Sequence, residues 1–176
     1  VFDKACFAPI VSTAGTGYDK STLKAPKGQY KALAGSAVVS PFTTMRAVSG
    51  LTDDEFKAVL TKLGLEGVDV ANFDPTNPKN AAYATTAAAL AKILNDISEI
   101  VSAAGGDPAL AFKAAANAMV THAKASTGTV FGDAAALSDL VGAAAGAGLT
   151  AGNKKSNGDP VWSDKALANA KSLATT

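Results

Sequence analysis

The amino-acid sequence predicts an all-α protein, a helical bundle of about six helices with an N-terminal extended arm able to form a strand. Three observations predict it. Alanine, the residue with the best helix propensity, occupies 39 of 176 positions. Helix-start signals follow one another along the chain, and apolar residues recur every three or four positions. We therefore divide the chain into an arm, residues 1–36, and an Ala-rich helical domain, residues 37–176.

The arm differs from the rest of the chain because Pro and Gly interrupt any helix there. Residues 7–11 are expected to form a short extended piece, and Pro9 places it at a sheet edge or outside a sheet. Residues 29–33 alternate weakly between apolar and polar side chains and are the second extended candidate. We expect contacts of the arm to be made by Cys6, Phe7, Pro9, Ile10, Val11, Tyr30 and Leu33.

The first two helices have clear local signals. Ser40 is a suitable N-cap with Pro41 at the first helical position, and Gly50 ends that helix. Thr52 and Glu55 have the spacing of a capping box, which predicts a second helix that ends at Gly64. Residues 64–79 then form a loop.

The longest helix is expected at about residues 80–104, where apolar side chains are spaced as in a bundle core. This stripe consists of Tyr83, Ala87, Leu90, Leu94, Ile97 and Val101, and is widened on one side by Ile93 and Ile100.

Three more helices follow in the second half of the chain. Asp107 and Pro108 start the fourth helix, which runs to about Lys124, and Asp133 caps the fifth, at about residues 134–147. Gly142 and Gly146 indicate either tight backbone packing or a fraying helix end. Residues 148–162 read as a polar, Gly-rich loop, and Ser163 or Asp164 starts a last short helix.

Composition excludes several classes of function. A formal net charge of +1 argues against nucleic acid as the partner. No apolar stretch reaches the length of a transmembrane helix. The sequence starts with Val1 and contains no basic n-region or apolar h-region, so we expect that a signal peptide was removed or never existed. With one cysteine and one histidine, Cys6 and His122, an intrachain disulfide and a Cys- or His-based zinc site are not expected, and no cofactor is predicted. Cys6 is either a buried thiol or an intermolecular link.

Two groups of side chains with oxygen donors could either bind calcium or have a structural role in their loops. They are Asp69, Asn72 and Asp74 in one loop, and Asn153, Asn157 and Asp159 in another. The first group lacks the Gly and Glu placement of an EF-hand loop, and turn and capping roles are favoured for it.

An ordered set of short motifs covers about residues 37–104. It consists of A-V-V-S-P-F-T-T-M at Ala37–Met45, G-L-T-D-D-E at Gly50–Glu55, L-G-L at Leu63–Leu65 and V-D-V-A-N-F-D-P at Val68–Pro75, and a long Ala-rich helix follows. This set resembles an α-helical module of large secreted or surface-exposed bacterial proteins and lipoproteins, in which a small β-sandwich repeat precedes the first motif. The resemblance implies an exported protein at the bacterial surface or in the extracellular matrix, and it does not imply an enzyme. The β-sandwich is missing here or reduced to residues 1–36.

The leading functional hypothesis is a structural protein that self-associates into an extracellular filament or surface assembly through its arm, as a homo-oligomer or polymer. The alternative is an adhesin or a helical module that binds a small apolar ligand or a surface partner. Its cavity would be lined by Phe42, Phe56, Phe73, Tyr83 and Phe112. Enzymatic activity is not expected, because the clustered carboxylates Asp53, Asp54 and Glu55 fit a helix first turn.

Overall fold

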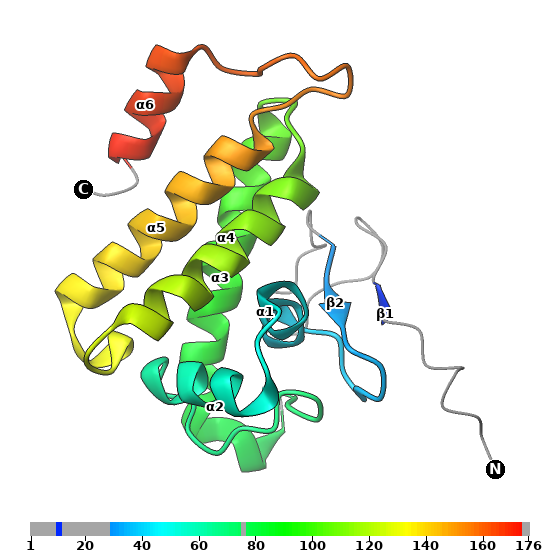
Figure 1. Cartoon of the computed structure of the whole chain (residues 1–176), viewed down its shortest axis with the longest axis vertical. Coiled ribbons are helices and arrows are strands. Elements are labelled where there is room, and N and C mark those ends of the chain that lie inside the picture. Colours follow the sequence, from blue (N-terminus) through cyan, green and yellow to red (C-terminus); the bar gives the residue numbers. More distant parts are fainter. Residues whose placement is uncertain (1–9, 12–28, 75–76, 174–176) are drawn as a thin grey trace.

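The computed structural model describes residues 10–11, 29–74 and 77–173, and its architecture confirms the predicted all-α bundle (Figure 1). Two short strands, β1 (Ile10–Val11) and β2 (Lys31–Ala32), precede the helices. The helices are α1 (Pro41–Ser49), α2 (Asp53–Lys62), α3 (Ala81–Ala103), α4 (Pro108–Ala125), α5 (Ala134–Gly152) and α6 (Asp164–Leu173). Two 3₁₀ turns, η2 (Pro78–Asn80) and η3 (Val130–Gly132), lead into α3 and α5.

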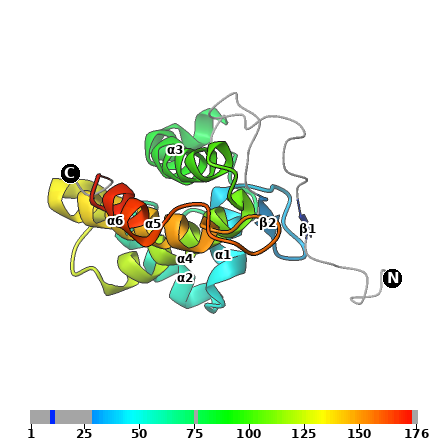
Figure 2. The ribbon, with the colours of Figure 1, turned by 90° about the horizontal axis from the view of Figure 1, so that it is seen from above.

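Helix α4 lies at the centre of the bundle and contacts α1, α2, α3 and α5. Helices α4 and α5 lie side by side, α1 and α2 pack at one end, and α6 contacts α5 on the outside (Figures 1 and 2). The centre of α4 is rich in small residues, and Ala111, Ala115, Ala116 and Ala123 are buried there. Small side chains let several helices approach one axis closely, which suits α4 to this central place.

The predicted helix starts are confirmed. Ser40 Oγ accepts a hydrogen bond from Thr43 N, and Thr52 and Glu55 form the expected capping box. Asp107 and Asp133 each accept hydrogen bonds from two main-chain N–H groups in the next turn. These contacts satisfy N–H groups that have no partner within their own helix.

Helix α3 matches its predicted extent and most of its predicted stripe. Ala87, Leu90, Leu94, Ile97 and Val101 are buried, whereas Tyr83 and Ile93 are partly buried. Ile100 is 55% exposed, so the expected widening of the stripe at this residue is wrong. It lies close to the α3–α4 turn, in the last turn of its helix.

The expected end of the fifth helix is wrong, because α5 continues beyond Ala147 to Gly152. Gly148 and Gly152 lie against α3 and α4. A Cβ atom on Gly148 would lie 2.5 Å from Ile97 Cγ2, and one on Gly152 would lie 2.6 Å from Val101 Cγ1. The packing of α5 against α3 and α4 therefore keeps Gly148 and Gly152 helical, although glycine has a poor helix propensity. A Cβ atom on Gly146 would meet nothing within 4 Å, so the tight packing considered for that residue is not found.

By length and composition α5 is the single helix, within the part of the chain that the structure describes, that could cross a membrane. This is weak evidence for a membrane span, since a helix of a bundle can have the same composition. Here α5 contacts α3, α4 and α6.

Candidate functional site

The two short strands form the smallest possible sheet. Strand β1 pairs antiparallel with β2, with Ile10 opposite Ala32 and Val11 opposite Lys31. Strand β2 also contacts α1, where Thr44 Oγ1 accepts a hydrogen bond from Lys31 N at 2.8 Å. The single Thr44 hydroxyl hydrogen is shared between Lys31 O at 3.2 Å and Ser40 O at 2.9 Å. Thr44 is buried, so this edge of β2 is closed by a side chain rather than by another strand.

Tyr30, the residue before β2, is buried in the helical core. Its ring packs edge-on against Phe112 of α4, with 5.0 Å between ring centroids. Its hydroxyl donates a hydrogen bond to Asn95 Oδ1 of α3 at 3.0 Å. The polar end of the side chain therefore has a partner at this partly buried place, and Tyr30 fixes the position of β2 on the bundle.

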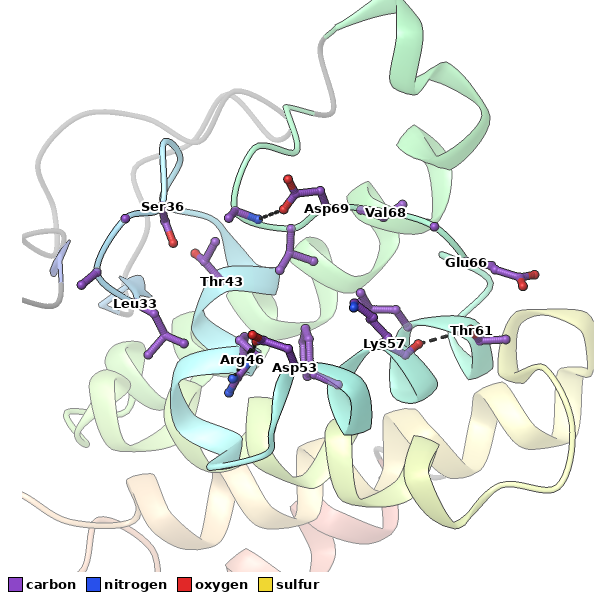
Figure 3. Close-up of a pocket in the computed structure, with 17 residues that line it drawn as sticks. Leu33, Ser36, Thr43, Arg46, Asp53, Lys57, Thr61, Glu66, Val68 and Asp69 are labelled. Carbon is purple, nitrogen blue, oxygen red and sulfur yellow. Dashed lines mark hydrogen bonds and ion pairs between the residues drawn. The ribbon is translucent and has the colours of Figure 1, made fainter.

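An open groove of about 760 Å³ lies beside β2, between the connection to α1, helices α1 and α2, and the loop after α2 (Figure 3). We call it the α1–α2 groove. Its wall next to β2 is made by residues 33–36, its base by α1 and α2, and its far wall by residues 66–71. Its apolar lining includes Leu33, Phe56, Leu60, Val68 and Val70.

The walls of the groove are tied together by hydrogen bonds. Ala37 N and Val38 N both donate to Ala71 O, at 2.9 and 3.3 Å, which joins the connection after β2 to the loop after α2. Asp69 Oδ1 accepts from Ala71 N at 3.1 Å and so holds the turn in that loop. The α1–α2 groove therefore lies between segments that are held in place relative to each other. Binding sites are usually preformed in this way.

Charged side chains of both signs surround the groove. Arg46 Nη2 donates to Asp53 Oδ1 at 2.9 Å, and the Arg46 guanidinium carbon lies 6.0 Å from the centroid of the Phe56 ring. This geometry combines an ion pair with a cation–π contact. Lys57, Glu66 and Asp69 add one positive and two negative charges.

The predicted arm residues fall into three groups. Cys6, Phe7 and Pro9 lie outside the described residues. Ile10 and Val11 form β1. Tyr30 is buried against α3 and α4, whereas Leu33 is 38% exposed and lines the α1–α2 groove.

Of the aromatic residues considered for a ligand cavity, Phe56 lines the groove. Phe42 and Phe73 pack on each other edge-on, with 5.6 Å between ring centroids, and Phe112 contacts Tyr30. Sequence reasoning did not find the groove itself, because its walls come from four segments whose proximity has no local signal.

The two groups of oxygen donors make hydrogen bonds within their loops. Asp69 Oδ2 accepts from Asn72 Nδ2 at 2.7 Å, and Asp159 Oδ2 accepts from Asn157 Nδ2 at 2.8 Å. The Asn153 amide instead makes two hydrogen bonds with the main chain of Trp162. Within residues 10–11, 29–74 and 77–173, no three His, Cys, Asp or Glu side chains gather in a way that could hold a metal ion.

His122 lies in the last turn of α4, as predicted. Together with Asp133, Asp139 and residues 125–129 it lines a smaller pocket of about 340 Å³. A comparison with known protein families, with curated proteins and with solved structures finds no match for this chain.

Proposed function

We propose that this protein is an exported, non-enzymatic structural subunit that self-associates into an extracellular filament or surface assembly. Its N-terminal arm makes the contact, with β1 of one copy pairing with β2 of the next. The motif resemblance to helical modules of secreted and surface-exposed bacterial proteins supports export. The geometry of β2 supports the mode of association.

The observation that carries the proposal is that β2 offers one edge to a partner strand. Lys31 directs its N–H and C=O groups to Thr44. Main-chain groups of successive strand residues point in opposite directions, so those of Ala32 face β1. Because Thr44 closes the other edge, an incoming strand cannot be added beside β1 on β2 and has to replace it.

Strand β1 is suited to replacement. A ladder of two residues contributes little stability by itself. Residues 12–28 join β1 to the rest of the chain, and a segment of this length reaches up to about 55 Å. It is therefore long enough to place β1 on β2 of a neighbouring copy.

Exchange of β1 leads to polymers when each copy donates its strand to one neighbour and accepts a strand from another. The donating surface, β1, and the accepting surface, β2 on α1, are different parts of the chain. Such a heterologous contact generates an open filament unless its rotation closes a ring. One short strand thus specifies a head-to-tail assembly.

The second candidate function is an adhesin or a module that binds an apolar ligand. The α1–α2 groove favours it. Its volume of about 760 Å³ is within the range of small-molecule sites, and Phe56 and Leu60 give it the apolar lining that such sites have. A protein that stays monomeric while an apolar ligand binds in the groove would support this candidate.

Strand exchange is tested by a Val11→Cys, Lys31→Cys pair in a Cys6→Ala background. These two positions form the non-hydrogen-bonded pair of the ladder, where Cβ atoms are close enough for a disulfide. After mild oxidation we expect covalent dimers and longer ladders on a non-reducing gel. Each single-cysteine variant is the control for random collision. Disulfides formed solely within one chain would contradict the proposal.

A further inference from the structure

We propose that the α1–α2 groove is the binding site for residues 1–9 of the chain that supplies β1. This inference rests on the proposed strand exchange, under which the occupant is a second copy of the protein. The strand pair then positions the incoming arm, and the groove provides most of its contact surface.

The direction of the ladder leads to the groove. Strands β1 and β2 are antiparallel, so the chain before Ile10 and the chain after Ala32 leave the ladder at the same end. Residues 33–36, which follow β2 directly, form the near wall of the groove. Figure 3 shows Leu33 on the side of the groove where the strands lie. A segment that continues from β1 therefore leaves the ladder at the end where this wall of the groove begins.

The lining of the groove matches an apolar peptide. Phe56 and Leu60 are buried and line it, and Val68 and Val70 are partly buried. Leu33 is one of the few large apolar side chains in the described part of the chain that is more than a third exposed. Residues 1–9 contain two aromatic side chains, Phe2 and Phe7, and few polar ones. Extended peptides gain affinity when alternate side chains enter such pockets.

The charges around the groove also suit this segment. Residues 1–9 contain one acidic and one basic side chain, Asp3 and Lys4. In the groove, Lys57 can form an ion pair with Asp3, and Asp53, Glu66 or Asp69 can form one with Lys4. The side chains of Lys57 and of its partner Asp54 are 72% and 94% exposed, so this ion pair is weak and can be exchanged at little cost.

The size of the groove fits part of the segment. Nine residues in extended conformation span about 30 Å. A volume of about 760 Å³ accommodates a few side chains of that length rather than all of them. The groove therefore takes one anchoring portion, and the remaining residues lie along the surface.

The native thiol of Cys6 provides the test. Lys57→Cys places a second thiol on the α2 part of the groove at an exposed position. Lys165→Cys is the matched control, because Lys165 is exposed on α6 at the opposite end of the bundle from α2 (Figure 1). Both full-length variants are oxidised at equal concentration, and the disulfides are assigned by peptide mass spectrometry. To separate interchain from intrachain links, isotopically light and heavy protein are mixed.

We expect an interchain disulfide between Cys6 and position 57, formed about tenfold faster than with position 165, because docking raises the effective thiol concentration. Equal rates at the two positions would overturn the groove inference, and interchain links between positions 11 and 31 would then leave strand exchange intact. An intrachain disulfide to position 57 would overturn the second copy as occupant. If positions 11 and 31 also link within one chain, strand exchange fails as well.

Discussion

Glu55 lies where the start of α2 meets the end of α4. One carboxylate oxygen accepts hydrogen bonds from Thr52 N and Thr52 Oγ1, at 3.0 and 3.1 Å. The other accepts from Lys124 Nζ at 3.1 Å. The Thr52 main-chain N–H, followed by Lys124, lowers the pKa of Glu55 from 4.5 to about 2. One side chain thus caps its own helix and joins it to the central helix.

This lowered pKa predicts a pH dependence of stability. The folded protein holds the Glu55 carboxylate charged down to about pH 2, whereas the unfolded chain protonates it near 4.5. The stabilisation is therefore fully present above pH 4.5 and is lost as pH falls from 4.5 to about 2. For Glu55→Gln we expect a lower urea midpoint than wild type at pH 7 and a difference that shrinks towards pH 2.

The matched control for this measurement is Asp54→Asn. It removes a carboxylate from the same helical turn, and the ion pair it breaks, with Lys57, is exposed on both sides. Neither Thr52 nor Lys124 loses its partner in this variant. A Glu55→Gln difference as large at pH 2.5 as at pH 7 would show that the charge of Glu55 contributes nothing.

The packing of α5 depends on two glycines one helical turn apart. Gly148 and Gly152 let this helix approach Ile97 and Val101 of α3 and Ala111 of α4. Close contact of backbones gives these helices many weak dispersion contacts without large side chains. For an Ala-rich bundle, such contacts replace part of the burial that leucines provide elsewhere.

We expect Gly148→Ala to lower the free energy of unfolding by about 1–3 kcal/mol, the usual cost of an overpacked core. The added methyl group would lie 2.5 Å from Ile97 Cγ2 and 3.1 Å from Ala111 O, and the latter is main chain that cannot move freely. The measurement is urea unfolding followed by circular dichroism.

Gly146→Ala, in the same helix, is the control with the opposite expected sign. Its added Cβ would meet nothing within 4 Å. Alanine should therefore stabilise the protein here by about 0.5–1 kcal/mol, through helix propensity alone. If both variants are stabilised, close approach at Gly148 is not important for the packing of α5.

For the whole molecule, the arm and the bundle share one core. Tyr30 and Ala32 belong to residues 1–36 by composition, yet both are buried, and Tyr30 contacts α3 and α4. Deleting all of residues 1–36 would therefore damage the bundle as well as any assembly contact. A deletion that tests assembly has to end before Gln29.

Deletion of residues 1–11 should abolish self-association and leave the helical core intact. It removes β1 and the segment before it, and it keeps Tyr30, β2 and the Thr44 contact. We expect polymers of the full chain in light scattering and negative-stain microscopy, a monomer for the shortened chain, and nearly equal melting temperatures.

Polymers that persist after the deletion would contradict the assembly role of β1. A monomer in both forms would contradict self-association altogether. It would direct attention to a ligand in the α1–α2 groove or to a partner on a surface.

The sequence by itself determined the helical class, the beginnings of the helices and the positions of β1 and β2. Ser40, Thr52 with Glu55, Asp107 and Asp133 act on main-chain groups within three residues of themselves. Because these contacts join residues that are neighbours in the sequence, the residue types alone predict where the helices begin.

Only the tertiary structure decided where α5 ends, where Tyr30 lies and how the α1–α2 groove is built. Gly148 and Gly152 stay helical because of contacts with residues about 40 to 50 positions earlier in the chain. Tyr30 meets Asn95 and Phe112, and the groove joins four segments. Contacts of this kind depend on how helices pack, and no local pattern of residue types encodes them.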